Sequence, residues 1–165
     1  MISTSRKMRV ALVFATVAAI ATGVPAETGT NPMVGTWKFN PAKSKFTPGP
    51  APKSILVKIE PVGEGVKAVS ETVDAESKTV VTEFTANYDG KDYPLKGSPG
   101  ADTVSLKRTG PRTATRTDKK SGKVVQTSTR EISEDGKSYT FTTEGKNAKG
   151  ESFKNVAVYD RQEKP

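Results

Sequence analysis

The side chains in this 165-residue sequence that could do chemistry are carboxylates, amines, guanidiniums and hydroxyls, because the sequence contains no histidine and no cysteine. The absence of both excludes the Ser-His-acid and Cys-His nucleophile arrangements, along with histidine-based zinc and haem sites. It also excludes disulfides. We therefore expect neither a metal site nor a cofactor.

The acidic residues show no spacing that marks an acid–base pair. Glu71, Asp74, Glu76, Glu83 and Asp89 are scattered among expected strands and turns. Two of them could still meet in space, as paired carboxylates do in glycosidases. Charge that keeps a surface soluble is the more common role. The sequence therefore favours a protein that is not an enzyme.

The densest group of positive charges lies between residues 107 and 123, where Asp118 is the one acid. On the strand expected here, Arg112 and Arg116 face one way and the neighbouring threonines face the other. If the threonines line an interior, the arginines lie on an outer face. This phase is favoured because burying an arginine without a partner is expensive. In the opposite phase, Arg116 points inward and could pair bidentately with a carboxylate or phosphate ligand.

An outer basic face would attract anionic envelope polymers or lipid headgroups. Nucleic acid is not expected as a partner, because no aromatic residues interleave with these cations to stack on bases. We refer to the following residues as the basic patch: Lys107, Arg108, Arg112, Lys119, Lys120 and Lys123.

Turn signals divide the chain into short segments rich in Val, Thr, Tyr and Phe, which favour strands. These signals recur roughly every 9–14 residues, the spacing of all-β sandwiches and barrels. Consecutive hairpins imply an all-β, antiparallel up-and-down meander of about 8–10 strands, which removes its edges most simply by closing into a barrel. The expected strands are Thr36–Phe39, Ser54–Glu60, Val66–Val73, Thr79–Tyr88, Tyr93–Lys96, Thr103–Arg108, Thr113–Asp118, Lys123–Ile132, Ser138–Thr143 and Ser152–Arg161.

The alternation of residues along these strands predicts a mixed interior. Thr82 and Phe84 share one side of their strand, and Asn155, Ala157 and Tyr159 share one side of theirs. A solid core would contain more Leu, Ile and Phe. A partly polar interior suits a cavity that holds water or a ligand, and a modestly packed β-domain with ordinary threonines is the alternative.

Residues 1–26 have the order of a signal peptide: basic residues, the apolar run Val10–Ile20, and small residues before a cleavage site after Ala26. The run is too short for an ordinary transmembrane helix. We therefore expect export to the periplasm or the cell exterior, and no membrane-spanning segment after cleavage. Residues 27–165 have the length of one β-barrel domain.

Residues 40–53 form a Pro-rich connection. Asn40 can cap a short helical turn that starts at Pro41, since proline suits the first helical position. Three further prolines at positions 48, 50 and 52 then favour extended chain.

Three segments resemble the calycins, which include lipocalins and fatty-acid-binding proteins. Gly35-Thr36-Trp37-Lys38 resembles their N-terminal signature. Residues 119–145 are similar to the late strands of fatty-acid-binding proteins, and Val156–Tyr159 resembles their last strand. The chain also resembles a family of exported bacterial proteins that opens with GTWKxNPAKSKFxPGPAPKS. The first resemblance implies a calycin-like barrel.

The calycin resemblance also implies roles for particular residues. Its tryptophan closes one barrel end beneath a basic side chain of the last strand, which implies a closing group of Gly35, Trp37 and Arg161. In fatty-acid-binding proteins, arginines of the late strands and a tyrosine of the last strand hold the ligand carboxylate. Tyr159 matches that tyrosine and Arg130 lies near one arginine, while Ala157 stands where another arginine is expected.

The candidate ligand-binding residues are therefore Arg130 and Tyr159, together with Arg116 in its inward phase. We expect an exported lipocalin-like protein that binds a small amphipathic or hydrophobic ligand inside its barrel. The alternative is an envelope interaction module that holds an anionic polymer or lipid headgroups on the basic patch.

Overall fold

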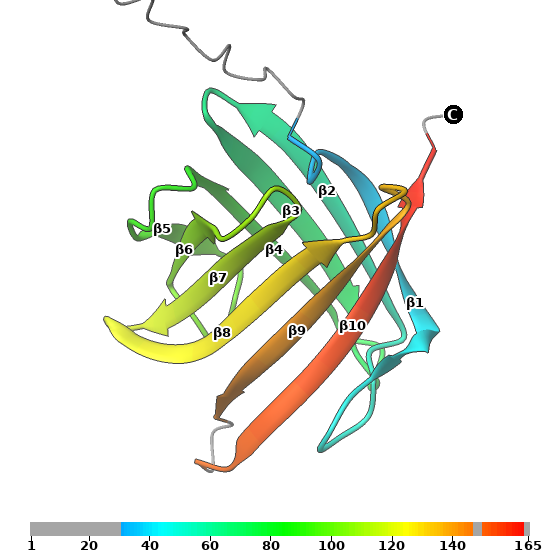
Figure 1. Cartoon of the computed structure of the whole chain (residues 1–165). Helices are drawn as coiled ribbons and strands as arrows, with labels where there is room; N and C mark the ends of the chain where they lie inside the picture. Colours follow the sequence, from blue (N-terminus) through cyan, green and yellow to red (C-terminus); the bar gives the residue numbers. More distant parts are fainter. Residues whose placement is uncertain (1–30, 147–149, 164–165) are drawn as a thin grey trace, which may run out of the picture.

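The computed structural model describes residues 31–146 and 150–163, and its regular secondary structure there is β-strand throughout. The strands form one closed antiparallel barrel in chain order, in which the first strand pairs with both the second and the last (Figure 1). This confirms the predicted all-β meander closed into a barrel. The predicted signal peptide, residues 1–26, lies outside the described residues. The strands are β1 Gly35–Lys45, β2 Ser54–Val62, β3 Gly65–Val73, β4 Thr79–Ala86, β5 Tyr93–Lys96, β6 Thr103–Arg108, β7 Thr113–Lys120, β8 Lys123–Ile132, β9 Ser138–Lys146 and β10 Ser152–Gln162.

Tight turns set the register of several hairpins. Ser121 and Gly122 join β7 to β8 with φ values of 51° and 76°. Two successive positive φ angles match the right-handed twist of antiparallel strands, and Gly adopts them without steric cost. Asp89-Gly90 does not form a hairpin of this kind. It lies in a longer connection from β4 to β5, where Asp89 bridges to Lys107.

β1 is longer than the sequence predicts, because strand pairing resumes beyond Asn40. The β1–β10 register passes from Asn40↔Val158 directly to Lys45↔Val156, so β1 carries extra residues there. The Asn40 side chain accepts a hydrogen bond from Lys43 N (3.2 Å), as a cap does, but no helix follows. Ser44 Oγ accepts from Val158 N (2.9 Å) and thereby replaces a backbone acceptor of the ladder. The predicted helical turn at Pro41 is therefore wrong, and the connection to β2 begins after Lys45.

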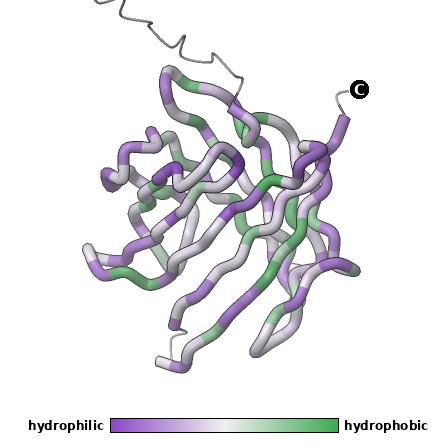
Figure 2. The backbone as a smooth tube through the Cα atoms, viewed as in Figure 1, coloured by the Kyte–Doolittle hydropathy of each residue, from purple (hydrophilic) through white to green (hydrophobic). Residues whose placement is uncertain are grey.

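Alternate residues of every strand point into the barrel, and the two barrel ends differ. At the end that holds both described termini, which we call the closed end, the inward side chains are buried around Trp37. At the opposite end, which we call the far end, apolar side chains such as Phe46, Ile55 and Val125 pack against the core and are only partly buried. Figure 2 shows hydrophobic and hydrophilic stretches interspersed along the strands. Among the described residues, no helix is long and apolar enough to cross a bilayer.

The barrel wall has its fewest inter-strand register pairs at β5. This four-residue strand has two register pairs with β4 and two with β6, whereas β2 and β3 align over nine. Fewer ladder hydrogen bonds make this part of the wall the one that opens at least cost.

Candidate functional site

A cavity of about 60 Å³ lies inside the barrel and is lined by both polar and apolar side chains. Its polar lining comes from six strands: Ser70 of β3, Thr82 of β4, Arg116 of β7, Arg130 of β8, Tyr139 of β9 and Tyr159 of β10. Its apolar lining is Val57, Ala68, Phe84 and Phe141. The structure therefore brings the three candidate ligand-binding residues, Arg116, Arg130 and Tyr159, around one space.

Arg130 is the most unusual side chain of this site, because it is a cation with only 6% of its surface exposed. Its guanidinium carbon lies 5.3 Å from the Tyr139 ring centre and 5.2 Å from that of Phe141. Cation–π attraction offsets part of the lost hydration. The Nε atom is buried and has no hydrogen-bond partner. A buried guanidinium with a free donor has an unmet demand for an anion or another acceptor.

Arg116 also points inward, and its guanidinium already has a partner. Its Nε donates to Asp118 Oδ1 at 2.8 Å, and the two side chains are 17% and 1% exposed. Gln126 Nε2 donates to the other carboxylate oxygen of Asp118 at 2.5 Å. The Arg116 guanidinium carbon lies 5.1 Å from the Phe84 ring centre. The site thus contains one paired and one unpaired guanidinium.

The favoured outward phase of the Arg116 strand was wrong for a definable reason. That phase rested on the cost of burying an arginine without a partner, but Asp118 stands two residues further along and hence on the same face. The lone acid in the basic stretch was the signal that could have indicated an inward pair. Ala114, Arg116 and Asp118 all face the interior, and the threonines between them face outward.

Two tyrosines form the wall beside Arg130. The rings of Tyr139 and Tyr159 are stacked, with centroids 4.5 Å apart and planes 18° from parallel. Burial raises the pKa of the Tyr159 hydroxyl to about 12, although Arg130 and Arg116 act in the opposite direction. Burial raises the pKa of Tyr139 still further, and the nearby Tyr159 adds to that rise. Both hydroxyls therefore stay protonated at neutral pH and can donate to a ligand oxygen.

Sequence reasoning missed Tyr139, Asp118 and Gln126. Tyr139 shares the inward face of β9 with Phe141, a period-two pattern visible in the sequence. Gln126 gave no such signal. The β7–β8 register shifts between Asp118 and Lys119, so that Val125 is left without an opposite residue. This irregularity depends on pairing between two strands and cannot be read from either one.

Trp37 closes the barrel next to this site. The side chain is fully buried, donates from Nε1 to Met33 O at 3.0 Å, and packs edge-on against Tyr139. The guanidinium of Arg161 lies 4.1 Å from the Trp37 ring centre. It also donates to the carbonyl oxygens of Pro32, Val34 and Gly136, at 2.7–2.8 Å. Burial lowers the pKa of Arg161 from its ordinary value.

Gly35 fits beneath this arginine for two reasons. Its φ of 143° is one that side-chain-bearing residues rarely adopt. A Cβ there would also stand 2.6 Å from Arg161 Nη1. Gly35, Trp37 and Arg161 are thus in mutual contact at the closed end of the barrel.

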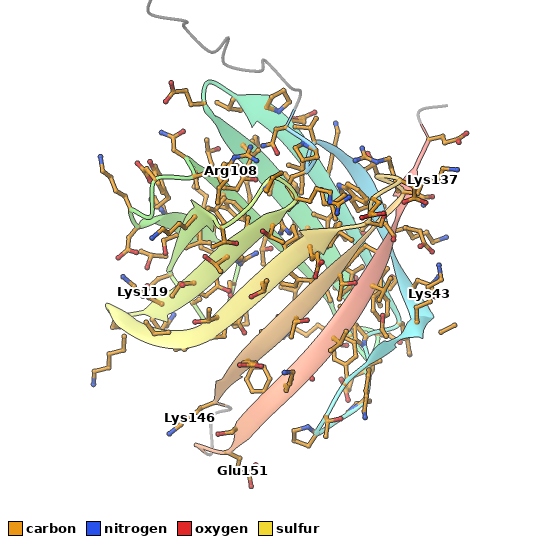
Figure 3. The ribbon with its side chains drawn as sticks, in the orientation of Figure 1. Lys43, Arg108, Lys119, Lys137, Lys146 and Glu151 are labelled. Carbon is orange, nitrogen blue, oxygen red and sulfur yellow. The ribbon has the colours of Figure 1, made fainter. Side chains whose placement is uncertain are left out.

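The basic patch does not form one surface. Lys107, Arg108 and Arg112 lie toward the closed end, while Lys119, Lys120 and Lys123 lie at the β7–β8 turn of the far end (Figure 3). Arg112 pairs with Glu134 at 3.2 Å, and Lys119 pairs with Asp92 at 2.7 Å. Arg108 stacks on Tyr88. The expected patch is divided between two ends of the molecule, and two of its cations are paired.

Within residues 31–146 and 150–163, no group of three or more His, Cys, Asp or Glu side chains is placed to hold a metal ion. The polar side chains that line the cavity carry guanidinium and hydroxyl groups, which can donate hydrogen bonds to acceptors and anions.

Comparison with known proteins gives information on the fold. No protein-family model matches the sequence, and no curated protein matches it. Zebrafish ileal bile acid-binding protein, solved in complex with cholic acid, is similar in structure at 16% identity and a TM-score of 0.53, covering 79% of this chain and 99% of its own. The siderocalin Ex-FABP, described as having dual ligand specificities, matches at 10% identity and a TM-score of 0.37, covering 81% of this chain and 76% of its own. The closed ten-strand antiparallel barrel, with its strands in chain order, is a calycin-like fold.

Proposed function

We propose that this protein is a non-catalytic carrier that binds a small amphipathic ligand inside its barrel through the unpaired guanidinium of Arg130. The supporting observation is the buried Arg130 Nε without a hydrogen-bond partner, beside the hydroxyls of Tyr139 and Tyr159. A carboxylate, sulfate or phosphate group on the ligand would accept from these donors. Charge-assisted hydrogen bonds of this kind are shorter and stronger than neutral ones.

The size of the cavity limits which part of the ligand it holds. About 60 Å³ accommodates a head group, whereas sites for whole drug-sized ligands occupy roughly 300–1,000 Å³. The remainder of the ligand would extend toward the far end, where Phe46, Ile55 and Val125 pack against the core and leave apolar surface partly exposed. An anionic head with an apolar tail fits both regions.

We also propose that the chain acts outside the cytoplasm, on the basis of the signal-peptide pattern of residues 1–26. The zebrafish protein named above supports the carrier proposal by its fold. We do not propose cholic acid, the ligand in that structure, as a ligand of this chain, because a cavity of about 60 Å³ cannot enclose a whole ligand of drug size.

Decyl sulfate is a suitable probe, because it joins one anionic head to an apolar chain. Titration calorimetry should show binding to the purified protein and loss of that binding in R130M. Methionine fits a buried apolar position, and because Arg130 has no ion-pair partner among the described residues, its replacement leaves no opposite charge buried and unpaired. R130M should therefore unfold at the same urea concentration as the wild type or a higher one.

The matched control is R112M, which removes an arginine from the outer surface, where Arg112 pairs with Glu134. It should bind decyl sulfate as the wild type does. Native mass spectrometry should also detect a co-purifying anionic amphiphile. The proposal is wrong if decyl sulfate does not bind, or if R130M and R112M bind it equally.

A further inference from the structure

Asp118 has a place in the fold that a surface carboxylate does not. It is 1% exposed, faces the barrel interior from β7 two residues beyond Arg116, and is not among the residues that line the cavity, whereas Arg116 is. Arg116 Nε and Gln126 Nε2 occupy its two oxygens. Burying a carboxylate at such a depth is expensive unless it is paired and hydrogen-bonded, and here it is both.

The ion pair between Arg116 and Asp118 determines the net charge of the site. Arg116, Asp118 and Arg130 are the charged side chains that the described strands bring together inside the barrel, with Tyr139 and Tyr159 protonated beside them. Arg116 and Asp118 neutralise each other, so the interior has one positive charge left over, on Arg130. A ligand with one negative charge is fully neutralised there, whereas a second negative charge would be buried without a partner.

We propose that Asp118 is a specificity-determining residue that makes the cavity select a singly charged head group over a doubly charged one. This inference rests on the proposed function. Without Asp118, Arg116 and Arg130 would both face the ligand unpaired and would together suit a dianion. Asp118 acts through Arg116 and does not touch the ligand.

Decyl sulfate and decyl phosphate distinguish the two charges, because they share an apolar chain and a tetrahedral head. At pH 8 the sulfate carries one negative charge and the phosphate nearly two, since the second pKa of a phosphate monoester is about 6. The wild type should bind the sulfate more tightly. In D118N the affinity ratio should move toward the phosphate by about tenfold or more, because a charge at this range shifts ionic equilibria by one to three powers of ten.

The matched control is E134Q, which makes the same charge change at the exposed partner of Arg112. Its affinity ratio should equal that of the wild type. The double variant R116M/D118N removes both charges of the pair and should also return to the wild-type ratio. If E134Q shifts the ratio as far as D118N does, net charge is responsible and the inference is wrong.

A second measurement requires no variant, which matters if D118N does not fold. At pH 5.5 decyl phosphate is mostly singly charged, and the sequence has no histidine that would titrate between pH 5.5 and 8. The wild-type preference for the sulfate should therefore largely disappear at pH 5.5. A preference that is unchanged between pH 8 and 5.5 would overturn the inference.

The outcomes separate the two proposals. If neither probe binds the wild type, the proposed function itself fails. If decyl sulfate binds in an Arg130-dependent way and the ratio in D118N equals that of the wild type, the carrier function stands and the role of Asp118 is wrong.

Discussion

At the scale of single residues, the interior of this barrel is organised by a contrast between two arginines. Arg116 has Asp118 at 2.8 Å, while Arg130 has only aromatic rings and an unused donor. In a medium of low polarity, an unmet charge costs far more than it would at the surface. This difference between the two arginines supports the proposal that Arg130 is the one that binds the anionic group of a ligand.

The buried Tyr159 predicts how stability changes at high pH. Its pKa is about 12 in the folded protein against about 10 in an unfolded chain, so the folded state favours the protonated form. The stability that results is complete below pH 10 and is lost as the pH rises from about 10 to 12. The loss is on the order of 2 kcal/mol.

Urea unfolding at several pH values between 8 and 11.5 would check this expectation for Tyr159. The Y159F variant should lose less stability than the wild type over the alkaline part of that range, because phenylalanine has no hydroxyl to ionise. Equal losses in the two proteins would contradict the assigned burial of this hydroxyl.

At the scale of elements, Arg161 holds together three pieces of chain at the closed end. It stacks on Trp37 of β1 and donates to carbonyl groups of the N-terminal segment and of the β8–β9 turn. Trp37 contacts Tyr139, which stacks on Tyr159. The closing group and the candidate site are therefore continuous through packed rings, and the closure helps to fix the wall against which Arg130 lies.

Replacement of Arg161 should therefore destabilise the whole barrel. R161M removes three charge-assisted hydrogen bonds and leaves three carbonyl groups to find other donors, which should cost about 3 kcal/mol in the free energy of unfolding. The measurement is chemical denaturation followed by the fluorescence of Trp37, the one tryptophan of the chain. R112M provides the comparison, since exposed ion pairs contribute about 0–1 kcal/mol. Equal losses in R161M and R112M would show that Arg161 does not hold these segments together.

At the scale of the whole molecule, the backbone pairing between strands is uneven around the closed barrel. β9 and β10 align over nine residues, as do β2 and β3, whereas β5 has two register pairs on each side. Since local opening follows the local density of hydrogen bonds and contacts, the wall at β5 should open before the rest. Such an opening would expose the interior near Phe84 and Leu95, which pair across β4 and β5.

Native-state hydrogen exchange should show this difference directly. The amides of Tyr93, Leu95 and Lys96 should exchange at least about tenfold faster than those at the centre of β9 and β10, because fewer ladder bonds protect them. Addition of decyl sulfate should slow exchange throughout the barrel if the ligand binds only the closed form. Protection at β5 equal to that of β9 would contradict the weakness of this wall.

The meander itself was predictable because its signals are local. Turn residues, β-branched composition and period-two alternation each act within a few residues, and they placed most of the ten strands close to their observed bounds. β1 departs from its predicted bounds because Ser44 pairs with Val158, a residue more than a hundred positions away. A contact of that range leaves no local pattern.

Part of the candidate site was predictable because some of its signals are also local in the sequence. The sequence by itself determined that the interior would be partly polar, that histidine and cysteine chemistry is absent, and which residues were candidates. The tertiary structure decided that Arg116 faces inward, that Asp118 neutralises it, and that Arg130 stays unpaired. The cost of a buried charge depends on its neighbours across the barrel, and only closure of the sheet brings those neighbours together.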